Sequence, residues 1–178
     1  MYPEVVLDRV VRDLKDRGTT ITVVCTGFPS DYRATNTFSI LWEQLSRWNI
    51  RDQIIYLGLV PHDDVLRLHR QAICVVNPSR FEGWGISIDE ARSIGKRVIA
   101  SDLPSHREQS PPGALYFDPA DEGQLAPLLE EVWKSAAPGP DRELEAQARI
   151  DLPRRLHAYA QDFLAVSREA LSEKGGHR

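Results

Sequence analysis

The sequence predicts an α/β fold in which helices cover both faces of a parallel, Rossmann-like sheet. Apolar residues at helical spacing alternate along the chain with short runs that are rich in β-branched residues. These runs are continuously apolar, which is typical of strands that are buried on both faces. With 178 residues, the chain has the length of one domain that can bury its own core.

The individual elements follow from the same patterns. A first helix carries Leu7, Val10, Val11 and Leu14 on one face, and Gly18 ends it. From there on, strands and helices alternate, which predicts a single parallel sheet of five strands. The expected strands cover residues 19–26, 53–57, 73–76, 97–101 and 114–117. The expected later helices cover residues 37–48, 63–72, 86–94 and 122–134.

A break that contains proline and glycine, at residues 135–141, divides the chain. Residues 1–135 hold the expected strands, and residues 136–178 are expected to form a helical extension of the same domain. This extension should contain two helical stretches separated by Pro153, because a proline interrupts the hydrogen bonds of a helix. The second stretch carries Leu156 and Phe163 on an apolar face.

The composition argues against several classes of protein. The formal net charge of -4, from 22 basic and 26 acidic residues, leaves no broad basic surface for nucleic acid. No apolar run approaches the ~20 residues of a membrane span, and charges interrupt the N-terminal region, which disfavours a signal peptide. We therefore expect a cytoplasmic protein without a transmembrane segment. Buried free thiols are the favoured state of Cys25 and Cys74 over a disulfide.

The loop after the third expected strand contains the residues best suited to binding a ligand. Open parallel sheets bind ligands outside the carboxyl ends of their strands. In this loop Gly83 and Gly85 flank Trp84 just before a helix. Glycines let the backbone approach a ligand closely, and free N–H groups at a helix start can hold an anion. Glu82 and Glu90 bracket the turn, so both carboxylates can face one cleft.

Purely structural interpretations of this loop stay open at this point. Glu90 follows Ser87 by three residues, which matches a capping box. Trp84 can also simply fold onto the core. His106 follows the fourth expected strand and could lie near the same cleft. The chain has no Cys, His and Asp spacing typical of a metal site.

The same region resembles a known family. Residues 77–102 read NPSRFEGWGISIDEARSIGKRVIASD. This segment resembles the signature of the GT-B retaining glycosyltransferases of family 4, in which two glutamates with seven residues between them enclose a Gly-aromatic-Gly turn. Glu82 and Glu90 have this spacing. Further blocks at residues 56–61, 103–108 and 114–119 extend the resemblance from about residue 5 to residue 133.

The resemblance implies transfer of a sugar from a nucleoside diphosphate sugar, with no cofactor and no metal. Glu82 would be the catalytic residue, close to the transferred sugar. Glu90 would bind the ribose hydroxyls, since a carboxylate accepts hydrogen bonds from both hydroxyls of a diol. The reaction would retain the anomeric configuration, through front-face attack assisted by the leaving diphosphate.

The resemblance also implies the rest of the donor site. Leu59 and Val60 would flank the nucleobase. The backbone N–H groups of Gly83, Trp84 and Gly85 would hold the donor sugar and the distal phosphate. Residues 1–135 would then be a nucleotide-sugar-binding domain.

The chain resembles one half of a GT-B fold, the C-terminal half that binds the donor. An N-terminal acceptor domain, or a separate partner chain, would supply the other half. In the family a strand and a loop with a basic pair precede the first helix, and nothing similar precedes Glu4, so we expect an unpaired sheet edge. Residues 156–171 resemble the family's final helix, which often packs on the N-terminal domain.

Two other functions remain open from the sequence. One is a non-catalytic nucleotide-sugar-binding or interaction module, and the other is a GT-B relative similar to the nucleotide-sugar epimerases. The sequence names neither the nucleobase and sugar of the donor nor the acceptor.

Overall fold

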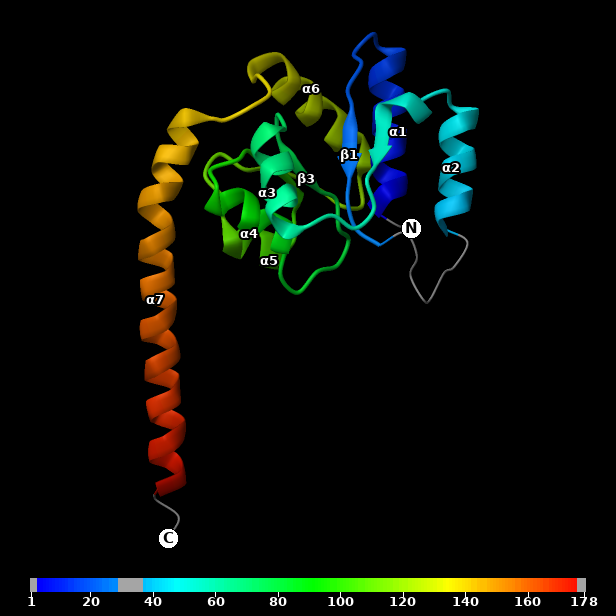
Figure 1. Cartoon of the computed structure of the whole chain (residues 1–178). Coiled ribbons are helices and arrows are strands. Elements are labelled where there is room, and N and C mark those ends of the chain that lie inside the picture. Colours follow the sequence, from blue (N-terminus) through cyan, green and yellow to red (C-terminus); the bar gives the residue numbers. More distant parts are fainter. Residues whose placement is uncertain (1–2, 29–36, 176–178) are drawn as a thin grey trace.

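The structure is a computed structural model that describes residues 3–28 and 37–175. Helices and short strands alternate along the chain (Figure 1). The strands are β1 (Val23–Cys25), β2 (Ile54–Tyr56), β3 (Val75–Asn77), β4 (Val98–Ser101) and β5 (Leu115–Phe117). The α-helices are α1 (Pro3–Asp16), α2 (Thr37–Arg47), α3 (His62–Gln71), α4 (Ile86–Ser93), α5 (Pro104–Gln109), α6 (Leu125–Ser135) and α7 (Arg142–Gly175). Short 3-10 turns, η1 (Arg51–Gln53) and η2 (Glu122–Gln124), precede β2 and α6.

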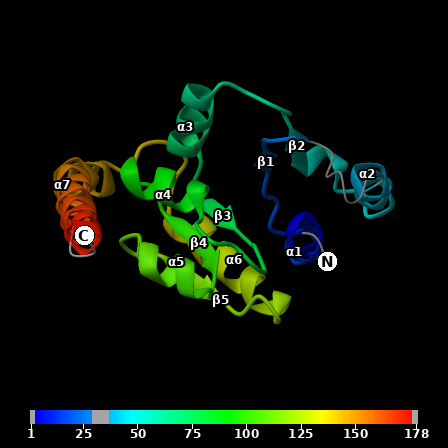
Figure 2. The same cartoon turned by 90° about the horizontal axis from the view of Figure 1, so that it is seen from below.

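The predicted α/β class is correct, but the prediction of one five-stranded sheet is wrong. The strands form two parallel sheets, β1-β2 and β3-β4-β5, and no ladder joins β1 to β3. In Figures 1 and 2 these two strands are the members of the two sheets that lie nearest each other. Within residues 3–28 and 37–175, both therefore have an open edge, as expected for a sheet that lacks one strand.

The core explains why the two sheets still form one body. The main apolar cluster joins α1, α2 and α6 to strands of both sheets. A smaller cluster joins α4 to the other face of β3 and β4. In β4, Ile99 belongs to the first cluster, while Val98 and Ala100 belong to the second. This strand is buried on both faces, as its continuous apolar sequence predicts.

The β1-β2 sheet is not buried on both faces. Val24 and Ile55, which pair with each other, are each 44% exposed. Helix α3 follows β2 but packs on α4, so it does not cover β1 and β2. A continuous apolar run was therefore a reliable sign of double burial for β4 and not for β1.

The C-terminal segment differs from its prediction. We expected two helical stretches, but α7 runs through Pro153 as one helix (Figure 1). Its first turns are attached to α3 and α4, because Arg70 makes two hydrogen bonds to Glu145 at 2.6 and 3.1 Å and Arg155 bonds Asp89 at 2.9 Å. These attachments lie on both sides of the proline and hold the helix in line across it.

The distal part of α7 extends past the rest of the molecule with apolar side chains exposed, including Leu156, Tyr159 and Phe163. None of the helices in the described ranges is long and apolar enough to cross a membrane. Neither Cys25 nor Cys74 forms a disulfide, as predicted, but both are half-buried rather than buried. Burial raises the pKa of the Cys74 thiol to about 11.

Candidate functional site

Glu82 lies in the loop between β3 and α4 and is held by side chains from the end of β3 and from α5. Its Oε2 atom accepts a hydrogen bond of 2.9 Å from Nδ2 of Asn77, the last residue of β3. The same oxygen lies 2.9 Å from Nε2 of His106 in α5, which follows β4. The backbone carbonyl of Glu82 accepts a hydrogen bond from Oγ of Ser105 at 2.8 Å. The Glu82 side chain is 26% exposed, so solvent and ligands can still reach it.

His106 contacts Glu82 directly, whereas the sequence predicted only that it could lie near the same cleft. Its side chain is completely buried, and its Nδ1 lies 2.8 Å from the carbonyl oxygen of Ser101. A usable signal was present in the sequence: the histidine follows β4, and the carboxyl ends of β3 and β4 share one edge of a parallel sheet. The contact itself joins residues 24 positions apart and required the fold.

The glycine turn is closed by α5 as well. The Gly85 N–H donates to Oε1 of Gln109 at 3.2 Å, and Nε2 of Gln109 donates back to the Gly85 carbonyl at 2.8 Å. The Gly85 N–H group is therefore already used within the protein, and its partner Gln109 is fully buried. Among the described residues, Gly83 and Trp84 have no hydrogen-bond acceptor for their N–H groups.

Trp84 is 47% exposed and is therefore not folded onto the core. The interpretation that the turn serves only to place Trp84 on the core is therefore wrong.

Glu90 points from α4 toward α3. Its Oε1 lies 2.8 Å from Nε2 of His62, the first residue of α3, and its Oε2 lies 4.0 Å from Nδ1 of His69. Burial lowers the pKa of His69. The nearby Glu90 charge raises this pKa, but by less than burial lowers it.

The capping-box interpretation of Glu90 is wrong. The N-cap of α4 is Gly85, with no side-chain cap, and Ser87 lies inside the helix. The Ser87 hydroxyl instead accepts a hydrogen bond from Asn77 at 3.1 Å. Glu90 has no capping partner there and is directed to the two histidines of α3.

The residues predicted to flank a nucleobase lie in the loop between β2 and α3. Leu59 is 74% exposed, and Val60 is half-buried. In the loop that carries Glu82, Phe81 is 93% exposed. Large exposed apolar side chains in loops at the carboxyl ends of strands are consistent with a surface that binds a ligand or a partner.

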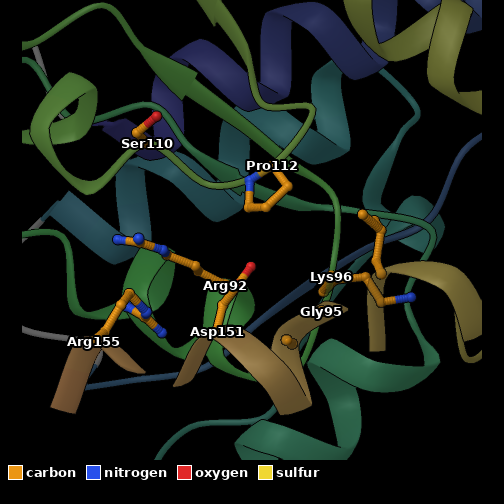
Figure 3. Close-up of a pocket in the computed structure, with 9 residues that line it drawn as sticks. Arg92, Gly95, Lys96, Ser110, Pro112, Asp151 and Arg155 are labelled. Carbon is orange, nitrogen blue, oxygen red and sulfur yellow. The ribbon is translucent and has the colours of Figure 1, made fainter. Parts of the chain in front are cut away.

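A cavity of about 180 Å³ lies elsewhere, where α7 packs on α4 (Figure 3). Arg92 and Arg155 lie on one side of it, and burial together with the nearby Arg155 charge lowers the pKa of Arg92. Lys96 donates to the carbonyl oxygens of Ala72 and Gly139, each at 2.7 Å. None of the predicted site residues lines this cavity, so we interpret it as a gap in the packing between α7 and the rest of the protein.

The structure contains no group of three or more His, Cys, Asp or Glu side chains arranged to hold a metal ion among its described residues.

Comparisons with known proteins point to one family. A sequence model of the family "Glycosyl transferases group 1" matches residues 6–150. The O-antigen chain mannosyltransferase B of Escherichia coli is 33% identical over 103 residues, which are 55% of this chain and 27% of that protein. The chain therefore spans about a quarter of the length of this relative.

Solved structures show the same fold. The C-terminal domain of a glycosyl transferase group 1 family protein, LpcC from Francisella tularensis, matches with a TM-score of 0.62 and 22% identity, over 80% of this chain and 70% of that one. HepE from Anabaena, solved in complex with UDP and glucose, matches with a TM-score of 0.62 and 19% identity, over 79% of this chain and 37% of that one.

Proposed function

The chain belongs to the glycosyl transferases group 1, and from this premise we propose that it is the donor-binding half of a retaining glycosyltransferase of family 4. Its substrate would be a nucleoside diphosphate sugar, bound without a metal or another cofactor. The observation that carries the proposal is the Glu82 to Glu90 segment. Both carboxylates belong to the segment that follows β3, and Glu82 is fixed by Asn77 and His106. The cytoplasmic location predicted from the sequence belongs to the same proposal.

The carboxylates have chemically distinct parts in this proposal. Among the described residues, Oε1 of Glu82 has no hydrogen-bond partner, so this atom is free to face the transferred sugar and the positive charge that develops there. Glu90 would bind the ribose diol, for which its Oε2 is free of hydrogen bonds in the described part of the chain and its Oε1 would leave His62.

The backbone contacts of the donor would come from Gly83 and Trp84. Gly85 would contribute its N–H only if Gln109 turned away. Leu59 and Val60 would cover the nucleobase. The similarity to a mannosyltransferase makes mannose the first donor sugar to test, and the HepE complex makes UDP the second nucleotide to test after GDP.

We also propose that a segment preceding α1 in a longer protein supplies the missing strand. Helices α1 and α2 pack against each other, so they lie on the same face of the sheet. Crossover connections between parallel strands are right-handed, so two successive crossovers on one face place their strands in order in one direction across the sheet. A strand before α1 would then lie beside β1, on the side away from β2, where β3 also has an open edge. The same upstream segment, or a separate chain, would provide the acceptor half.

Calorimetric titration tests donor binding. The purified chain is titrated with GDP, GDP-mannose, UDP and UDP-glucose. We expect weak binding of one nucleoside diphosphate and its sugar derivative, either GDP and GDP-mannose or UDP and UDP-glucose. The dissociation constant should be near millimolar, which corresponds to a binding free energy of about -4 kcal/mol. Absence of binding for all four would overturn the proposal.

A transfer assay tests whether catalysis requires a second, acceptor-binding half. With radiolabelled sugar nucleotides and a broad acceptor panel, we expect no transfer by the chain alone. Holding donor and acceptor together contributes about 7–11 kcal/mol to catalysis, and one wall of a cleft cannot supply that positioning. Robust transfer without a partner would contradict the need for a second half. Donor binding without transfer, even after an upstream half is added, would favour the non-catalytic module instead.

A further inference from the structure

We propose that His106 is the positioning residue that presents Glu82 to the donor sugar. The inference rests on the proposed function, because it gives Glu82 a sugar to contact. It adds a residue that the family resemblance does not assign.

The hydrogen bonds of the His106 ring fix its orientation. A carbonyl oxygen can only accept, so the Nδ1 atom that faces Ser101 carries a proton. Nε2 faces Oε2 of Glu82 at 2.9 Å, and that oxygen also accepts a hydrogen bond from Asn77. The ring is completely buried, so Nε2 has no alternative partner in water.

Helix α5 holds the whole turn rather than Glu82 alone. Ser105 bonds the Glu82 carbonyl, His106 bonds the Glu82 carboxylate, and Gln109 bonds both backbone groups of Gly85. These three side chains fix the beginning and the end of the Glu82–Gly85 turn. Oε2 of Glu82 is thus used for positioning, and Oε1 is left for the ligand.

The positioning role predicts which part of donor affinity depends on His106. The nucleoside diphosphate is bound by other groups in the proposed site, so its affinity should not depend on the ring. The additional affinity contributed by the sugar depends on Glu82 and should fall when Glu82 loses its partner on α5.

The first test compares affinities for GDP-mannose and GDP, and for UDP-glucose and UDP, by calorimetry. In His106→Leu, which removes both ring nitrogens, the ratio of sugar nucleotide to nucleoside diphosphate affinity should fall about tenfold, the lower range for one hydrogen bond to a charged group. His106→Gln can place an amide N–H near the position of Nε2 and should recover most of the ratio. His157→Leu, at an exposed position of α7, is the matched control and should leave the ratio unchanged.

These measurements separate two kinds of failure. If the wild-type chain binds none of the four compounds, the proposed function fails. If it binds them but His106→Leu changes the ratio no more than His157→Leu does, the positioning role is wrong. Equal wild-type affinity for GDP and GDP-mannose, and for UDP and UDP-glucose, would also overturn it.

The second test does not depend on any ligand. Nε2 is the ring atom that faces Glu82, so Glu82→Gln should shift the nitrogen-15 NMR signal of His106 Nε2 and leave the signals of His157 unchanged. A His106 signal that does not change in Glu82→Gln would contradict the inference even if the affinity ratio fell.

Discussion

Replacing Gly95 with alanine should loosen the attachment of α7 to the rest of the protein. Gly95 ends α4 with a φ of +72°, a region that residues with a side chain rarely adopt. A Cβ at this position would come closer than 3.0 Å to backbone atoms of Leu144 and Glu145 at the start of α7. Because these are backbone atoms, the contact can be relieved only by moving α7 away.

The expected loss of stability has two parts. The left-handed conformation costs an alanine about 1–2 kcal/mol. The steric conflict adds about 1–3 kcal/mol, as for other insertions into packed regions. We therefore expect the free energy of unfolding to fall by about 2–5 kcal/mol in Gly95→Ala.

Gly18→Ala provides the matched control. Gly18 has a φ of +83°, but no heavy atom lies within 4 Å of a Cβ placed there. This variant should lose only the conformational part, about 1–2 kcal/mol. Both variants are measured by urea unfolding, followed by circular dichroism. Equal losses in the two variants would show that α7 does not pack on Gly95 as described.

Three further predictions follow from the site and the core. Glu90→Ala should weaken the binding of the preferred nucleoside diphosphate about tenfold or more, the range for charged hydrogen bonds; calorimetry with unchanged affinity but a lower melting temperature would assign Glu90 a structural role only. Burial lowers the pKa of His69 below the ordinary histidine value of 6.5, so the unfolded chain binds the extra proton and stability should fall as the pH drops below about 6.5. Urea unfolding at pH 7.5 and pH 5.5 should show a smaller difference in His69→Gln than in wild type, and an equal difference would refute the effect. Since the pKa of Cys74 is raised to about 11, from 9.0, native Cys74 should react with iodoacetamide at pH 8 about a hundredfold more slowly than in the unfolded chain; similar rates by mass spectrometry would contradict its burial.

The sequence alone determined the features that depend on neighbouring residues. Apolar periodicity predicted the five strands and the helices between them except α5, and the continuous run in β4 predicted its burial on both faces. The spacing of Glu82 and Glu90 is a property of the chain itself. It predicted two carboxylates on either side of a glycine turn before the structure placed either of them.

Only the tertiary structure decided the features that join distant residues. Whether β1 pairs with β3 depends on what lies between them, so the sheet divides where local patterns predicted one sheet. Pro153 stays inside α7 because Arg70 and Asp89, from two other helices, hold the segments on either side of it. The partner of Glu82 is a histidine 24 residues away, brought there by the parallel pairing of β3 with β4. Local propensity is a sum over neighbours, whereas these contacts arise only when separate elements pack against each other.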